Sequence, residues 1–296
     1  MNPNYRLHCN KLFERANEGS LLPKHVVFLS VEGTKTEVQY FDLIQKHRAE
    51  MKIDAIVQVE VLRRTDTKSD PESVLELLDE YMAIREDGGL EKVLARLELR
   101  SFDRAFIEAY RNDKKSVPPA DRKKFESVLN DESVDLQYLH FLNRYKGEND
   151  VFGIVIDRDA KSHTAAQMRR VQSSCRKKGY HCFITNPCFE FWLLLHVSDV
   201  STEYADHLEE IKENRIGAGK RPYVAELLHN KTGQKKHIKV KTFTEHYLPN
   251  VDLAIERAEG FAKEENLIDE IGSNLGELFG LLRKPRLARD ELAQPE

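Results

Sequence analysis

Two nearly continuous apolar runs constrain the fold of this chain more than any other feature of its sequence. They are HVVFLSV at His25–Val31 and VFGIVI at Val151–Ile156, and both are rich in β-branched or aromatic residues. Uninterrupted runs of this kind are typical of parallel strands buried on both faces of a sheet. Each is followed by a polar turn and a helical pattern, at Thr36–His47 and Thr164–Lys178. The chain is therefore predicted to be an α/β protein.

Further segments continue this alternation of strand and helix. The expected architecture is a Rossmann-like parallel sheet with helices on both faces. The additional strands are predicted at Ile53–Leu62 and Tyr180–Ile184, and the additional helices at Ser73–Met82, Phe189–His196, Asp252–Lys263 and Leu275–Leu282.

The alternation is interrupted between residues 84 and 150. Apolar residues recur there at helical spacing amid dense charge, which predicts a helical insertion in a sheet domain made of residues 24–83 and 151–283. Residues 1–23 are expected to be an N-terminal extension and residues 284–296 a frayed tail. Residues 214–238 contain three glycines and many basic residues, which predicts a mobile loop or arm.

Composition excludes several classes of protein. No apolar stretch approaches the roughly 18 residues of a membrane helix, and the opening residues lack the apolar core of a secretory signal. The four cysteines form no C-x-x-C pair, which favours reduced thiols. We therefore expect a cytoplasmic protein with no membrane contact.

The net charge of −4 hides two positive blocks. Residues 158–178 hold seven basic side chains against one acid, and residues 212–241 hold nine against two. Such local fields would attract a polyanion, although a solvated helix face explains the first block equally well. The candidates for nucleic-acid contacts are Arg158, Lys161, Arg169, Arg170, Lys177, Lys235, Lys236 and Lys239.

Carboxylates follow both long apolar runs. Glu32 and Gly33 come directly after the first, and Asp157 and Asp159 end the second. The carboxyl ends of parallel strands gather functional groups at one sheet edge, and residues two apart on an extended strand project to the same side. Clustered carboxylates repel one another unless a hard cation neutralises them. We therefore predict a site for Mg²⁺ or Mn²⁺ formed by Glu32, Asp157 and Asp159.

Two other acids have structural alternatives. Glu37 is a possible metal ligand, but Thr34-x-x-Glu37 matches a capping box and favours a structural role. Glu190 lies in an otherwise apolar helix, where a charge needs a partner, and it suits a supporting role as well as a ligand role. By contrast, Cys188 is expected to be buried filler, and Trp192 and His196 to be packing residues.

The order strand–Glu-Gly, then strand–Asp-x-Asp, resembles the Toprim domain of topoisomerases, primases and OLD-type nucleases. The run Asn186–His196 (NPCFEFWLLLH) is similar to a hallmark of the RloB family, a Toprim-like group associated with abortive phage resistance and the AbiL system. That family pattern favours a second acid two residues after the first glutamate, where this chain has Thr34.

The resemblance implies a Toprim-type nuclease that cleaves tRNA or DNA. Glu32 would act as metal ligand or general acid/base, Asp157 and Asp159 would hold the metal, and Lys241 or Lys239 would stabilise the phosphate in the transition state. A solvated face is the structural alternative for both lysines. The resemblance also implies a partner ATPase of the ABC or AAA type, since this chain has no G-x-x-x-x-G-K-[ST] motif. A homo-oligomer stays open.

Two other functions compete with this interpretation. The chain could be a non-catalytic nucleic-acid-binding or scaffolding subunit whose acidic cluster is structural. Alternatively, Asp157 could be the nucleophile of a D-x-D phosphatase or phosphotransferase. That chemistry normally places D-x-D after the first strand, whereas here Glu32 comes first, so we rank it last.

Overall fold

A computed structural model of the chain describes residues 25–54, 57–63, 70–86, 89–131, 134–136, 138–139, 142, 147, 149–217 and 220–283. The expected N-terminal extension and C-terminal tail lie outside these residues. The chain folds as two compact units. Of the described residues, unit 1 contains those in the ranges 62–63 and 76–147, and unit 2 contains those in the ranges 25–61, 70–75 and 149–283.

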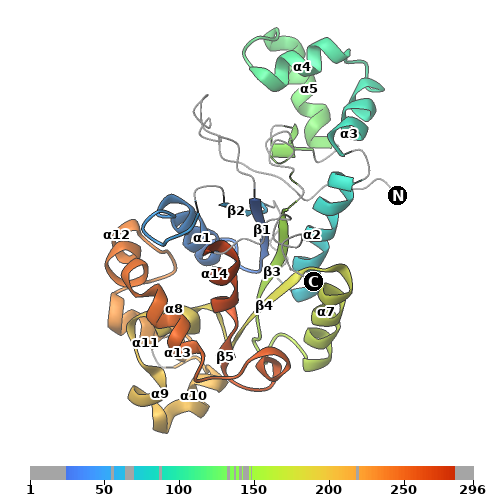
Figure 1. Cartoon of the computed structure of the whole chain (residues 1–296). Coiled ribbons are helices and arrows are strands. Elements are labelled where there is room, and N and C mark those ends of the chain that lie inside the picture. The colour runs from blue at the N-terminus through green and yellow to red at the C-terminus, as the bar shows by residue number, and fades with distance from the viewer. Residues whose placement is uncertain are drawn as a thin grey trace, which may run out of the picture. The chain divides into compact units, whose positions relative to one another are not determined.

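Unit 2 is built on a five-stranded sheet with the order β2-β1-β3-β4-β5 (Figure 1). The first four strands are parallel, and β5 runs antiparallel to β4. The predicted parallel α/β fold is confirmed. The strands are β1 (His25–Val31), β2 (Val57–Val61), β3 (Val151–Asp157), β4 (His181–Asn186) and β5 (Gly272–Ser273).

The strand order changes direction between β1 and β3. From β1 the chain moves outward to β2, and from β3 it moves the opposite way to β4. In open α/β sheets the crevice at such a switch point, outside the carboxyl ends of the strands, is where ligands bind. Glu32 follows β1 directly and Asp157 is the last residue of β3, so both lie at this point.

Alternate strand residues serve the two faces of the sheet. On one face Val27, Leu29 and Val31 join an apolar core with the helices α1 (Thr36–Lys46), α8 (Phe189–Val197), α11 (Tyr223–Thr232), α13 (Val251–Ala258) and α14 (Leu275–Arg283). Figure 1 shows α1 and α14 on this side of the sheet and α7 on the other. The helices of unit 2 are α1 (Thr36–Lys46), α7 (Ala165–Lys178), α8 (Phe189–Val197), α9 (Val200–Glu203), α10 (Leu208–Glu213), α11 (Tyr223–Thr232), α12 (Val240–Thr242), α13 (Val251–Ala258) and α14 (Leu275–Arg283). The unit also contains three short 3-10 helices, η1 (Ala205–His207), η3 (Leu248–Asn250) and η4 (Glu264–Ile268), and a π-helix, η2 (Phe243–Tyr247).

Unit 1 is helical and has a core of its own. Leu90, Val93, Leu94 and Leu97, whose spacing predicts a helix, are buried in it together with Phe125. The helices are α3 (Gly89–Glu98), α4 (Arg104–Asn112) and α5 (Pro119–Asp131), and α2 (Pro71–Glu86) begins in unit 2 and ends in unit 1.

Two predictions about local structure are wrong. Residues 214–238 are not one long loop, because α11 (Tyr223–Thr232) occupies their centre and buries Val224 and Leu228 in the core. The strand expected at Ile53–Leu62 is shorter, since β2 has only the five residues that pair with β1. No helix in the described part of the chain is long and apolar enough to span a membrane.

Candidate functional site: a carboxylate cluster under a basic rim

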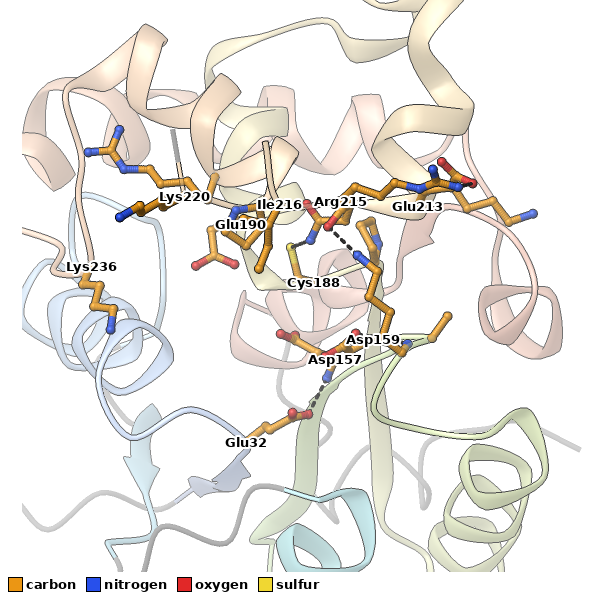
Figure 2. Close-up of a pocket in the computed structure, with 18 of the residues that line it drawn as sticks. Glu32, Asp157, Asp159, Cys188, Glu190, Glu213, Arg215, Ile216, Lys220 and Lys236 are labelled. Carbon is orange, nitrogen blue, oxygen red and sulfur yellow. Dashed lines mark hydrogen bonds and ion pairs between the residues drawn. The ribbon is translucent and has the colours of Figure 1, made fainter. Parts of the chain in front are cut away.

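A cavity of about 730 Å³ lies at the carboxyl ends of β1 and β3 (Figure 2). Glu32, Asp157, Asp159 and Glu190 all line it, so the structure brings these four predicted site residues to one place. Glu190 projects from the first turn of α8 and faces the same space as the strand-end carboxylates (Figure 2). The sheet edge therefore holds an acidic pocket of the size of a small-molecule site.

Glu32 and Asp157 are joined directly. The backbone N–H of Asp157 donates to Oε2 of Glu32 at 2.8 Å, and the backbone N–H of Glu32 donates to the carbonyl of Val155 at 3.0 Å. The sheet ladder thus extends one step past β1 and fixes the start of the Glu32 side chain. Nε2 of the buried His163 lies 3.3 Å from the other Glu32 oxygen, Oε1.

His163 is a member of the site that the sequence analysis missed. Its hydrogen bond to Glu32 raises the pKa of the imidazole, and the charge of Glu32 acts in the same direction. The carbonyl of His163 accepts from the guanidinium of Arg158 at 2.7 Å. Its only sequence signal was its place just after the D-x-D segment, which does not distinguish it from an ordinary turn residue.

Glu37 belongs to the same acidic group. The predicted capping box is absent, because the residue that caps α1 is Lys35 and makes no side-chain cap. Instead Oε1 of Glu37 accepts from the backbone N–H of Gly33 at 3.1 Å. A side chain on Gly33 would overlap the Glu37 carboxylate, so glycine at this position lets Glu37 reach the turn after β1.

Burial and the neighbouring carboxylates raise the pKa values of Glu37 and Asp157. Burial, followed by the charges of Glu190 and Glu32, raises the pKa of Glu37 to about 7. Burial, followed by Glu32, Glu37 and Glu190, also holds the pKa of Asp157 well above its usual range, although the backbone N–H of Phe189 opposes this shift. Like charges in a poorly solvated site disfavour ionisation until a cation joins them.

Asp159 differs from the other acids of the cavity. Its carboxylate accepts from the hydroxyl of Ser162 at 2.7 Å and from the backbone N–H of Lys161 at 3.3 Å. Both of its oxygens therefore stabilise its own turn, and Asp159 is not among the main causes of the raised pKa values of Asp157 and Glu37. The sequence placed Asp157 and Asp159 on one side of the strand, as the cavity lining has them, but could not reveal this difference.

The donor set fits a hard divalent cation in its chemistry. Mg²⁺ and Mn²⁺ prefer oxygen ligands, and Glu32, Glu37, Asp157 and Glu190 offer only carboxylate oxygens. Among the described residues, no three acidic, histidine or cysteine side chains have donor atoms already gathered around one point. Binding would therefore require these side chains to turn toward a shared ion.

The basic candidates separate into two groups. The guanidinium groups on α7 are compensated by acids on facing elements, with Arg169 lying 2.5 Å from Asp269 and Arg170 lying 3.3 Å from Glu72. Arg158 is turned inward, and its Nε donates to the carbonyl of Ile268 at 2.5 Å. The positive field predicted for residues 158–178 is thus reduced by pairings that sequence spacing does not reveal.

Lys161, Lys235 and Lys236 do line the cavity, and Lys220 joins them. The segment that carries Lys235 and Lys236 is tied to α1, because the hydroxyl of Thr36 donates to the carbonyl of Lys236 at 3.2 Å. In contrast, Lys241 is 81% exposed, lies 3.7 Å from Glu245 and is not part of the cavity, so its predicted catalytic role has no geometric support. Lys177 and Lys239 are exposed outside the cavity lining.

A buried aromatic network fixes the two helices that carry Glu37 and Glu190. The indole N–H of Trp192 on α8 donates to the hydroxyl of Tyr40 on α1 at 3.0 Å, and Nε2 of His196 lies 3.1 Å from the same hydroxyl. Burial lowers the pKa of His196 to about 3, so this imidazole is neutral. Trp192 and His196 are therefore core residues. Burial raises the pKa of the Cys188 thiol, which disfavours a thiolate nucleophile.

We expect the metal-free protein to lose stability as the pH rises across this site's titration range. Glu37 has a pKa of about 7 against an ordinary value of 4.5, so between these values the folded protein keeps a proton that the unfolded chain releases. The contribution of Glu37 to the free energy of unfolding should therefore fall from about pH 4.5 to about pH 7. Urea unfolding in EDTA, compared with Glu37→Gln at each pH, measures it. A constant difference between the two proteins would contradict this expectation.

Comparison with known proteins gives one result. The model of the RloB family, described as RloB-like protein, matches residues 27–280, which span most of the chain. No curated protein and no solved structure matches it. The family match includes both strand ends, the NPCFEFWLLLH run and every described residue of the cavity. The resemblance to the RloB family that was drawn from the sequence is confirmed, and the chain belongs to the RloB-like protein family.

Proposed function

We propose that this protein is a metal-dependent nuclease that hydrolyses phosphodiester bonds. One observation carries the proposal, namely a single cavity that holds a cluster of carboxylates and also lysine ammonium groups. Carboxylates that share a divalent cation and cations that face phosphate oxygens are the two requirements of metal-assisted phosphoryl chemistry. The site lies at the switch point of the sheet, where α/β proteins bind ligands.

The residues of the site have three proposed roles: metal ligands, supports of a ligand, and phosphate-binding cations. Glu32 and Asp157 would hold Mg²⁺ or Mn²⁺, with Glu37 and Glu190 completing the oxygen ligands. Such an ion, when bound, polarises a phosphate and lowers the pKa of water. His163 supports Glu32 by donating to Oε1, and the Asp157 N–H fixes Oε2. Lys220, Lys235 and Lys236 would neutralise the phosphate groups of the substrate.

The biological role that we propose rests on the family. RloB-like proteins resemble Toprim effectors of abortive phage resistance, and we propose that this chain acts in the cytoplasm as such an effector. A partner ATPase of the ABC or AAA type would supply any ATP-dependent control. Copurification of an ATPase with the tagged chain from its native host, and loss of phage protection when either gene is deleted, would test this role.

The nuclease proposal is tested by incubating the purified protein with labelled tRNA, plasmid and single-stranded DNA. We expect cleavage with Mg²⁺ or Mn²⁺ and none in EDTA. The exposed Asp206 lies outside the cavity, so the control variant Asp206→Asn should cleave as fast as the wild-type protein.

Each of the other outcomes identifies a different function. Salt-sensitive binding without turnover would support a non-catalytic binding subunit. Release of phosphate from a monoester, with phosphate trapped on Asp157, would support a phosphotransferase. Either result would overturn the nuclease proposal.

A further inference from the structure

The wall of the cavity above the carboxylates is a short turn that we call the rim loop, residues 214–217 and 220–222. Its first residue, Asn214, is fixed from three directions. The carbonyl of Asn214 accepts from Nζ of Lys161 at 3.0 Å, its Nδ2 donates to Sγ of Cys188 at 3.3 Å, and its Oδ1 accepts from the backbone N–H of Val224 at 3.0 Å. The rim loop is therefore anchored to the end of β3, the start of α8 and the start of α11.

The basic side chains that line the cavity differ in their partners. Arg215 pairs with Glu213 at 2.6 Å, and Arg221 pairs with Glu226 at 3.1 Å. Within the described part of the chain, the ammonium groups of Lys220, Lys235 and Lys236 have no hydrogen-bond or ion-pair partner. Figure 2 shows Lys220 and Lys236 on one side of Glu190. Uncompensated ammonium groups beside a cavity are the ones free to bind phosphate.

The rim loop also presents an apolar side chain to the cavity. Ile216 lines the cavity and is 69% exposed, although its neighbours in the lining are mostly charged (Figure 2). An exposed isoleucine costs the free protein little, but it gains a contact if a flat apolar group enters. In a nucleic acid the flat group with apolar faces is the base, which the sugar joins to the phosphates.

The cavity that Ile216 lines has the size of a small-molecule site. A volume of about 730 Å³ falls in the range of small-molecule pockets, about 300–1,000 Å³. Inside a duplex both faces of a base are covered by stacking, and its edge is paired. Proteins that bind single strands combine a positive groove with aromatic side chains on which exposed bases stack. In this cavity the aliphatic side chain of Ile216 is an apolar group available to a base.

We infer that the cavity binds an unpaired nucleic-acid strand, with Ile216 packed against a base and Lys220, Lys235 and Lys236 facing the phosphates. This inference rests on the proposed nuclease function and specifies its substrate as single-stranded DNA or RNA, or an unpaired loop or end. Base contact by one isoleucine favours neither purine nor pyrimidine hydrogen-bonding edges, so the selection is for an unpaired state rather than a sequence.

The test is equilibrium binding in EDTA, where no metal-dependent cleavage occurs. Labelled 12-residue single strands and the same strands annealed to their complements are titrated by fluorescence anisotropy. We expect the single strands to bind at least about tenfold more tightly than the duplexes. Ile216→Ser should weaken single-strand binding about tenfold and leave duplex binding unchanged, while Ile216→Leu should retain the wild-type affinity.

Matched controls separate contact from general effects. Val240 is an exposed apolar residue outside the cavity, so Val240→Ser should change neither affinity. Lys236→Gln should weaken binding to all strands and reduce the salt slope by about one, whereas Lys263→Gln, outside the cavity, should not. Unchanged thermal unfolding of Ile216→Ser would show that the fold is retained.

Four results would overturn the inference: equal or tighter binding of duplex, no effect of Ile216→Ser on single strands, competition by a free mononucleotide at equal affinity, or no nucleic-acid binding. Cleavage with Mg²⁺ reports separately on the proposed function. Cleavage of duplex alone would keep the nuclease and reject the unpaired strand. Selective single-strand binding without cleavage would do the reverse.

Discussion

Asp157→Asn should reduce nucleic-acid cleavage by on the order of 10³-fold. The substitution removes a carboxylate that we propose as a metal ligand. A rate loss of this size corresponds to about 4 kcal/mol of transition-state stabilisation. The backbone N–H that fixes Glu32 is retained, so the geometry of the strand end should survive. Initial rates of cleavage at saturating Mg²⁺ measure the effect.

Asp159→Asn is the matched comparison, two residues away on the same side of the chain. Because Asp159 stabilises its own turn through Ser162 and the Lys161 N–H and is not one of the proposed metal ligands, we expect a loss of about tenfold or less. A larger loss for Asp159→Asn than for Asp157→Asn would assign the metal to the outer aspartate and contradict this account.

Gly33→Ala should lower cleavage by about 10- to 100-fold while the fold is retained. The new methyl group would overlap the Glu37 carboxylate and force it out of the acidic group. The displaced atoms are the end of a flexible side chain, so the protein can adjust without moving its backbone. Loss of one repelling charge should also lower the pKa of Asp157, because Glu37 contributes to raising it. Cleavage rates measure the loss of activity, and urea unfolding in EDTA measures whether the fold is retained.

A double-mutant cycle identifies the cause. If Gly33→Ala acts through Glu37, the double variant Gly33→Ala with Glu37→Ala should cleave no more slowly than Glu37→Ala alone. Additive losses would show that Gly33 acts by another route, for example through the backbone of the turn.

The sequence was most informative where structure is determined locally. The apolar runs at His25–Val31 and Val151–Ile156 form β1 and β3 almost residue for residue, because a parallel strand buried on both faces needs such a run. The same logic brought Glu32 and Asp157 together, since parallel strands end at one edge. This argument covers Glu32 and Asp157, whereas Glu190 reaches the cavity from the first turn of α8.

Features that depend on tertiary partners could not be predicted. Arg169 and Asp269 are 100 residues apart, and no spacing rule announces that they pair. Glu37 satisfied a capping-box pattern, yet its carboxylate reaches Gly33 because the turn after β1 brings the two together. Lys220 and Ile216 lie in a segment expected to be a mobile loop, but α11 shortens it and anchors the rim loop at Asn214.

The central claim is that the carboxylates at the ends of β1 and β3 hold a divalent cation. Anomalous diffraction from crystals soaked in Mn²⁺ tests it most directly. This account predicts a manganese peak coordinated by Glu32 and Asp157, with an oxygen from Glu37 or Glu190. Absence of a peak there at saturating Mn²⁺, or a peak bound only by Asp159 and His163, would contradict it.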